Sequence, residues 1–277
     1  MSDSQVTIGA ALGYAWSLWR THWRQIWGAL ALNALAWTVL CAGVFAQNWR
    51  LMAAADLGLV FTMFATYGAV IRLAFGSEHP DDPEFRLGAL GLQWRWTELK
   101  MLGAHVLLVI FLVILTLLLS LAVAAPAMGV VLSKVSAIPA TFTQADLART
   151  LGPSGMQLLN LASLAIQLIL MFVLTRLSLY LVATADRKKV SVLRTWKLTR
   201  GHFWQIFAAS LVIGLPTVLI MSVGLGAGMS VDGKPAPLAP GETFLYSLIC
   251  GGWFGAAAMP LAAGVQAYFY RNLKTAD

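Results

Sequence analysis

The sequence predicts an all-α fold, a polytopic bundle of membrane-spanning helices. Hydrophobic residues make up 59% of the chain and charged residues 11%, and the mean hydropathy is +0.74. Soluble domains are about half apolar and a quarter charged. Several apolar runs also have the roughly 20 residues that a helix needs to cross a hydrocarbon core of about 30 Å. We therefore expect lipid to surround most of this chain.

Six apolar runs are long enough to be membrane helices. They cover residues 26–47, 52–75, 100–124, 155–183, 204–227 and 244–270. We expect one integral membrane domain, residues 1–277, built from three hairpin modules at 1–75, 80–186 and 187–277.

The links between these runs contain turn-forming residues. The stretch SVDGKPAPLAPGE, within 228–243, has Gly and three prolines, which suit neither a helix nor hydrocarbon. The long link at 125–154 contains TQADLART, for which we expect a short surface helix.

The distribution of Lys and Arg predicts the orientation, because cytoplasmic loops of membrane proteins carry the excess. One side holds fourteen of them, Arg20, Arg24, Arg72, Arg86, Arg95, Lys100, Arg187, Lys188, Lys189, Arg194, Lys197, Arg200, Arg271 and Lys274. The other side holds four, Arg50, Lys134, Arg149 and Lys234. Both termini should therefore be cytoplasmic. The basic loops are short and lie beside spans, so anionic lipid headgroups, and not nucleic acid, are the expected partners.

A partial repeat precedes the first and fifth spans. At an offset of 180, WSLWRTHWRQIWGA (16–29) and WKLTRGHFWQIFAA (196–209) match at seven of fourteen positions. A weaker version, RLGALGLQWRWTELK (86–100), precedes the third span. We call residues 8–24, 191–203 and 86–100 the first, second and third interfacial segments.

These segments have the composition of interfacial amphipathic helices, with Trp rings at headgroup level and cations in water. In the first, apolar residues from Ile8 to Trp23 form one stripe opposite Arg20 and Arg24. Either each segment only anchors the helix that follows, or the three form a cytoplasmic collar that binds anionic lipid or a protein partner. The candidate contact residues are Trp16, Arg20, Arg24, Arg194, Trp196, Lys197 and Arg200.

Arg176 is the only charged residue between Leu151 and Ala185. A helix of that length exceeds the hydrocarbon thickness, so Arg176 either reaches the headgroups or is buried. In the buried case it needs a carboxylate, and we expect an intramembrane pair with Glu98, at the cytoplasmic start of the third span.

The last two spans contain Pro216 and Pro260, each of which tends to kink its helix. Gly251 and Gly255 are spaced as GxxxG, which favours close helix contact. Kinked helices with small faces occur both in transporters, where they line binding sites, and in inert bundles.

No catalytic motif of the Walker A, HExxH, GxSxG or dinucleotide-binding type is present. Cys41 and Cys250 lie inside apolar runs without metal-ligand spacing, and we expect them to be packing residues. His105 and Asn33 are isolated polar residues within spans, and we assign them no catalytic role. We therefore expect no enzymatic activity, no cofactor and no metal site.

Three stretches carry a resemblance to a known group of proteins. They are RLSLYLVATADRKKVSVLRTWKLTRGHFWQIF (176–207), TELKMLG and ALGYAWSLWRTHWRQI. They resemble uncharacterised six-helix inner-membrane proteins of Gram-negative bacteria, distantly similar to the membrane domain of some glycerophosphoryl diester phosphodiesterases. The resemblance implies an inner-membrane location and a link to lipid or envelope metabolism, but no catalytic residue.

Together these observations predict a non-enzymatic inner-membrane scaffold or accessory protein that contacts anionic lipid or a partner. The alternative is a small transporter or lipid-handling protein, with a path near the kinked fifth and sixth spans. In that case Arg176 would attract an anionic headgroup.

Overall fold

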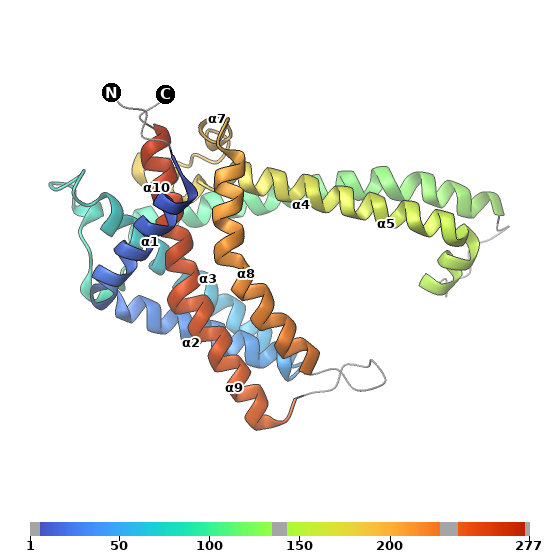
Figure 1. Ribbon diagram of the computed structural model, residues 1–277, viewed down its shortest axis with the longest axis horizontal. Helices are drawn as coiled ribbons and strands as arrows, with labels where there is room; N and C mark the ends of the chain where they lie inside the picture. The colour runs from blue at the N-terminus through green and yellow to red at the C-terminus, as the bar shows by residue number, and fades with distance from the viewer. Residues whose placement is uncertain (1–5, 135–142, 228–237, 275–277) are drawn as a thin grey trace. The chain divides into compact units, whose positions relative to one another are not determined.

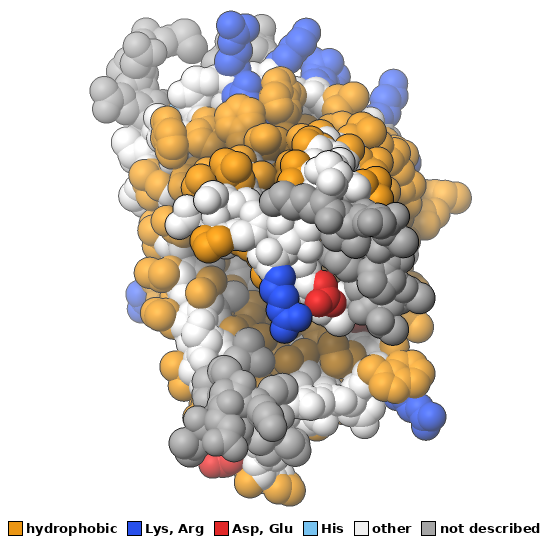
Figure 2. All heavy atoms as spheres, turned by 90° about the vertical axis from the view of Figure 1, so that its right-hand side faces the viewer, with side chains coloured by type: hydrophobic (Ala, Val, Ile, Leu, Met, Phe, Trp, Pro, Cys, Tyr) orange, Lys and Arg blue, Asp and Glu red, His pale blue; other side chains and the backbone are white. Residues whose placement is uncertain are grey.

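The computed structural model describes residues 6–134, 143–227 and 238–274, and all regular structure in these ranges is helical (Figure 1). Six helical segments are long and apolar enough to cross a membrane, which confirms the predicted all-α, six-span class. On the face drawn in Figure 2, hydrophobic side chains predominate and charged ones are few.

The helices follow the predicted order with different ends. The α-helices are α1 Ile8–His22, α2 Trp27–Phe45, α3 Trp49–Phe75, α4 Trp96–Lys134, α5 Gln144–Leu177, α6 Tyr180–Arg187, α7 Thr195–Leu198, α8 Phe203–Ala227, α9 Pro240–Gly251 and α10 Met259–Lys274. A π-helix, η4 Gly252–Ala258, joins α9 to α10, and 3₁₀ turns lie at η1 Trp23–Gln25, η2 Pro83–Phe85 and η3 Ala89–Gly91.

The chain forms two compact units, described separately. Unit 1 contains residues 1–104 and 177–277, and unit 2 contains 105–176. The first and third predicted modules therefore share one unit, together with both ends of the second.

The sixth span, α9–η4–α10, is the central element of unit 1. Its first half packs on α2, where Trp37 stacks on Phe254 with ring centroids 4.5 Å apart. Its second half packs on α1, with Tyr14 and Tyr268 rings 5.8 Å apart. Because Trp19 instead bonds to Ala256, α1 runs antiparallel to α10. The start of α1 and the end of α10 therefore lie side by side (Figure 1).

The part of unit 1 with the most fully buried side chains surrounds the last turns of α10. We call this region of unit 1 the terminal end. It combines the second half of α3, α6, the start of α1 and the last turns of α10. Phe64, Phe75, Val182 and Phe269 are fully buried there. A second core surrounds Cys41, Phe45 and Cys250 between α2 and α9. Both cysteines are buried and unbridged, as expected of packing residues.

Unit 2 contains the rest of α4 and most of α5. Its surface is strongly apolar, with large exposed side chains such as Leu117, Leu118, Leu121 and Leu158. Helices that are apolar all round need an apolar solvent or a protein cover. This surface fits the two spans that the sequence places here.

The link between these two spans differs from the prediction. Helix α4 continues past the expected end at 124, through Pro126, to Lys134. The predicted surface helix TQADLART forms the start of α5, where Thr143 and Asp146 bond to each other's backbone N–H. A kink at Gly152 (φ +70°) separates it from the rest of α5. The prediction for 228–237 lies outside the described residues.

Candidate functional site

A buried ion pair joins the last turn of α3 to the first turn of α4. The side chains of Arg72 and Glu98 are 2% and 0% exposed. The guanidinium faces both carboxylate oxygens, with Nη2 donating to Oε2 at 3.1 Å and Nη1 to Oε1. Such two-pronged pairs fix geometry as well as charge. The pair therefore ties two consecutive spans together.

Further hydrogen bonds complete this cluster. Nε of Arg72 donates to the Glu84 carbonyl at 2.6 Å, and the Arg95 backbone N–H donates to Glu98 Oε2 at 2.9 Å. A Cβ on Gly68 would lie 2.0 Å from Glu98 Oε1, so only glycine leaves room for the carboxylate there. Both charges are compensated by protein groups, which is the arrangement expected of a structural clamp.

The expected partner of Glu98 was Arg176, and the structure gives it Arg72. The two residues of the predicted pair fall in different units, so that pair stays a prediction; in unit 2 the Arg176 guanidinium lies 5.9 Å from the Phe172 ring centroid. The signal for Arg72 was present in the sequence. Arg72 lies at the end of the second predicted span and Glu98 at the start of the third, so both are on the predicted cytoplasmic side of the membrane.

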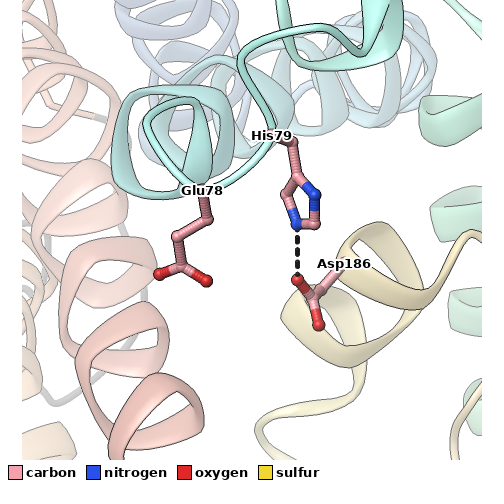
Figure 3. Close-up of side chains that lie close together, drawn as sticks. All are labelled: Glu78, His79 and Asp186. Atoms are coloured by element: carbon pink, nitrogen blue, oxygen red, sulfur yellow. Dashed lines mark hydrogen bonds and ion pairs between the residues drawn. The ribbon is translucent and has the colours of Figure 1, made fainter.

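A second polar cluster lies at the terminal end (Figure 3). Asp186, on α6, accepts from Tyr270 at 2.9 Å and lies 3.3 Å from Nε2 of His79. Lys274 Nζ lies 2.9 Å from Glu78 Oε2 and 3.3 Å from Asp186 Oδ1. Arg271 also pairs with Glu78, at 2.7 Å. The cluster joins the turn after α3 to α6 and α10.

Three residues of this cluster could ligate a metal ion. One ligand atom each from Glu78, His79 and Asp186 lies within 4.8 Å of the others, and nitrogen with carboxylate oxygens is a donor set that Zn²⁺ accepts. The Lys274 ammonium already lies between the two carboxylates, so a metal would have to displace it. The arrangement is an ion-pair network as it stands, and the expected absence of a metal site stays a prediction.

An adjacent ion pair joins Asp82 to Lys188, whose left-handed backbone ends α6. The hydrogen bond from Lys188 lowers the pKa of the Asp82 carboxyl. Both residues are partly exposed, so this pair contributes less than the buried one.

Two polar side chains stabilise the break in the sixth span. Pro260 has no N–H to offer the Ala256 carbonyl, four residues earlier, and Trp19 Nε1 donates to that carbonyl at 2.9 Å. The π-helix shifts the Met259 N–H to Phe254, which leaves the Gly255 carbonyl to Asn33 Nδ2 at 3.0 Å. Asn33 and Trp19 therefore supply the donors that the helix lacks. The sequence marked Pro260 as a residue that disturbs its helix, but it predicted neither the π-helix nor these donors.

Gly251 and Gly255 allow the close contact that their spacing predicts. A Cβ on Gly255 would lie 2.4 Å from backbone atoms of Ala34, and one on Gly251 would lie 2.6 Å from the Ala34 carbonyl oxygen. The backbone of α2 thus lies directly against η4, which brings Asn33 within reach of its carbonyls.

A small pocket lies between α8 and the sixth span, where the sequence suggested a path. It has a volume of ≈ 250 Å³, and its lining includes Ser210, Thr217 and Gln266. The Thr217 hydroxyl accepts from Trp253 at 3.0 Å. Within the described part of the chain, no hydrogen bond reaches the buried Oε1 of Gln266.

All seven candidate lipid-contact residues lie on the surface of unit 1. The exposed side chains are Trp16, Arg20, Arg24, Arg194, Trp196, Lys197 and Arg200. Matching positions of the repeat are also buried alike: Ile26 and Ile206 are both 1% exposed, and the matched pair Ala29 and Ala209 is buried too. The two copies therefore share one pattern of inward and outward residues.

The three interfacial segments differ in secondary structure. The first is the helix α1, which packs on α10; its buried residues are Ala11 and Ala15, whereas Trp16 and Trp23 of the apolar stripe are exposed. The second contains only the four-residue α7. The third contains the short turn η3, where Leu90 and Gly91 adopt positive φ, and becomes α-helical only from Trp96, the first residue of α4.

The segments also contact one another or shared helices. A Cβ on Gly91 would lie 2.9 Å from Cα of Ile26, so the third segment packs against the residues that immediately follow the first segment. Helix α1 also contacts α8, and α7 contacts α10. This arrangement is compatible with the collar hypothesis.

Comparison with family models, curated proteins and solved structures finds no match for this chain.

Proposed function

We propose that this protein is a non-enzymatic scaffold or accessory protein of the bacterial inner membrane that binds anionic lipid headgroups through its interfacial segments. Both termini would be cytoplasmic, and a membrane protein partner could share the same surface. The observation that carries the proposal is the second segment, where exposed cations and exposed apolar side chains alternate.

The second segment has the side chains that a lipid interface binds. Leu193 is 69% exposed, and Trp204, immediately after the segment, is 73% exposed. Arg194, Lys197 and Arg200 are also exposed, and within residues 6–134, 143–227 and 238–274 none of them forms an ion pair. Apolar side chains can enter the headgroup region while cations meet phosphates, at about 1 kcal/mol per cation.

The structural role is supported by how the buried charges are used. Arg72 and Glu98 satisfy each other, and Lys274 and Arg271 together pair with Glu78 and Asp186. Catalytic acids and bases need a site from which they can reach a substrate. These clusters instead join neighbouring helices.

The test compares lipid retention by the wild type and by Arg194→Gln/Lys197→Gln/Arg200→Gln. We expect native mass spectrometry of the detergent-extracted variant to show loss of bound phosphatidylglycerol or cardiolipin, with normal expression and insertion. The matched control is Arg50→Gln/Lys134→Gln/Arg149→Gln, three cations predicted for the opposite side. Equal anionic lipid retention by wild type and test variant would contradict the proposal. A reporter fused at the C-terminus tests the orientation.

A second candidate function is transport or lipid handling along the fifth and sixth spans. The observation that favours it is the pocket beside η4, which combines Ser210, Thr217 and Gln266 inside two apolar spans. Filling it with Gly214→Leu should abolish substrate movement in vesicles if this candidate is right. The same substitution should leave lipid retention at the second segment unchanged.

A further inference from the structure

A groove on unit 1 lies where α2 and α3 meet the residues just before α4. It has a volume of ≈ 360 Å³ and is lined by Ala29 and Leu32 of α2, Phe61, Thr62 and Ala65 of α3, and Leu92, Gln93 and Trp94. This size is at the lower end of the range for ligand pockets, about 300–1,000 Å³. The rings of Phe61 and Trp94 lie 5.2 Å apart at its rim.

The groove offers one unused hydrogen-bond donor. The Gly88 backbone N–H donates to Gln93 Oε1, which fixes the orientation of the amide. The Gln93 Nε2 group is buried and, among the described residues, has no acceptor. Thr62 cannot supply a second donor, because its hydroxyl already donates to Asn33 at 3.1 Å. A buried donor without an acceptor is costly, so a ligand that accepts from Gln93 is favoured.

The position of the groove identifies the class of ligand. Its two helical walls are candidate membrane spans, and Leu32 and Phe61 are exposed on them, so lipid is the solvent at this face. Ala29 and Leu32 lie within the first two turns of α2, next to the Trp-rich start of that span. The ester carbonyls of glycerolipids lie at this depth, between headgroups and acyl chains, and they accept hydrogen bonds without donating any.

We infer that the groove binds one phospholipid of the surrounding bilayer. An acyl chain lies along Leu32, Phe61 and Ala65, and an ester carbonyl accepts from Gln93 Nε2. The site recognises the glycerol ester and the chain, which phospholipids share, and not the charge of the headgroup. It is therefore distinct from the proposed binding of anionic headgroups at the second segment and does not depend on it.

The test uses the full-length protein in vesicles that contain a phospholipid with a photoactivatable diazirine on one acyl chain. We expect light-dependent labelling of peptides from α2, α3 and residues 92–94. Leu32→Trp should reduce this labelling at least about fivefold, because the larger side chain fills the groove. Leu35→Trp is the matched control: Leu35 is one turn further along α2, is more exposed (59% against 44%) and does not line the groove.

The hydrogen bond is tested by Gln93→Glu, which keeps an acceptor for Gly88 but replaces the donor. We expect light-dependent labelling at the groove to fall about threefold to tenfold, the factor that one hydrogen bond contributes. Gln93→Met, which adds no charge, should weaken it similarly.

Phosphatidylethanolamine and phosphatidylglycerol probes should label equally, also in the Arg194→Gln/Lys197→Gln/Arg200→Gln variant. Labelling that survives Leu32→Trp, or that requires the anionic probe, would overturn the inference. Loss of labelling at the groove with normal anionic lipid retention would leave the proposed function intact.

Discussion

Replacing Glu98 by Gln removes the negative charge of the buried pair at almost constant volume. The amide oxygen can still accept from the Arg95 backbone N–H. The Arg72 guanidinium, however, would stay in a site where 2% of its side chain is exposed, with only neutral acceptors such as the Glu84 carbonyl. We therefore expect Glu98→Gln to destabilise unit 1.

The expected magnitude follows from the burial. Removing one partner of a buried ion pair costs about 3–5 kcal/mol. The acceptors that remain around Arg72 place the loss at the lower end, about 3 kcal/mol. In a chain of this size each kcal/mol shifts Tm by about 2–4 °C, so we expect a decrease of about 6–12 °C. Arg72→Met/Glu98→Gln removes both charges and should recover about 2 kcal/mol of this loss.

The buried thiols of Cys41 and Cys250 provide the assay. They lie together in the core between α2 and α9, so a thiol-reactive dye reaches them only after unit 1 opens. Thermal melts of the purified protein in detergent then give Tm for the wild type, both single variants and the double variant. Asp81→Asn, at an exposed carboxylate outside the cluster, controls for nonspecific effects of removing a negative charge.

Two results would refute the reasoning about this pair. A Glu98→Gln decrease below about 2 °C would mean that Arg72 does not need the charge. A double variant as unstable as the sum of the two single variants would mean that the residues do not interact, and that each acts through other contacts.

Three further predictions concern other parts of unit 1. Gly255→Ala should prevent normal folding, because its Cβ would lie 2.4 Å from the α2 backbone, whereas Gly252→Ala, which meets nothing within 4 Å, should be tolerated; expression and melting of both variants check this. Trp19→Phe should lower the free energy of unfolding by about 1 kcal/mol, because the Ala256 carbonyl loses its donor. The loss should be much smaller in a Pro260→Ala background, where the restored N–H can satisfy that carbonyl. Equal losses in both backgrounds would disprove the coupling. Asp82→Asn should cost less than about 1 kcal/mol of stability above pH 4, since Lys188 is 43% exposed. The difference from wild type should vanish as the pH falls through the lowered pKa of Asp82, because the wild-type carboxylate is then protonated. A difference that grows at low pH in thermal melts would contradict this.

The spans could be predicted because a bilayer imposes a length and a composition on every helix that crosses it. The first, second and fifth predicted spans lie within three residues of α2, α3 and α8 at both ends. The third was predicted too short, because the sequence 125–134 is apolar and Pro126 does not end α4.

The polar sites were harder to predict because they depend on which helices become neighbours. Glu98 was expected to pair with Arg176, which stays a prediction, and its buried pair with Arg72 was not foreseen. Asn33 and Trp19 become donors only because the π-helix and Pro260 leave two carbonyls beside them. No local sequence pattern around Asn33, Trp19 or Pro260 predicts that these residues become neighbours.

The interfacial segments fall between these cases. The two copies of the repeat at an offset of 180 both bury their isoleucine, Ile26 or Ile206, and both expose their cations. Helical periodicity overstated the order of the third segment, where Leu90 and Gly91 turn the chain. Periodicity shows which residues share a helix face, but it does not show where a helix is interrupted. The turn at Leu90 and Gly91 depends on contacts with α2, which lie far away in the sequence.

The antiparallel packing of α1 on α10 has a consequence for biosynthesis. Trp19 and its acceptor on Ala256 are 237 residues apart, so at about 5–20 residues per second the ribosome delivers the acceptor roughly 10–50 s after the donor. During that interval α1 has no α10 to pack against, and the face that it later buries is still uncovered by α10. A chain that stops before α10 therefore lacks the helix against which α1 packs in the finished protein.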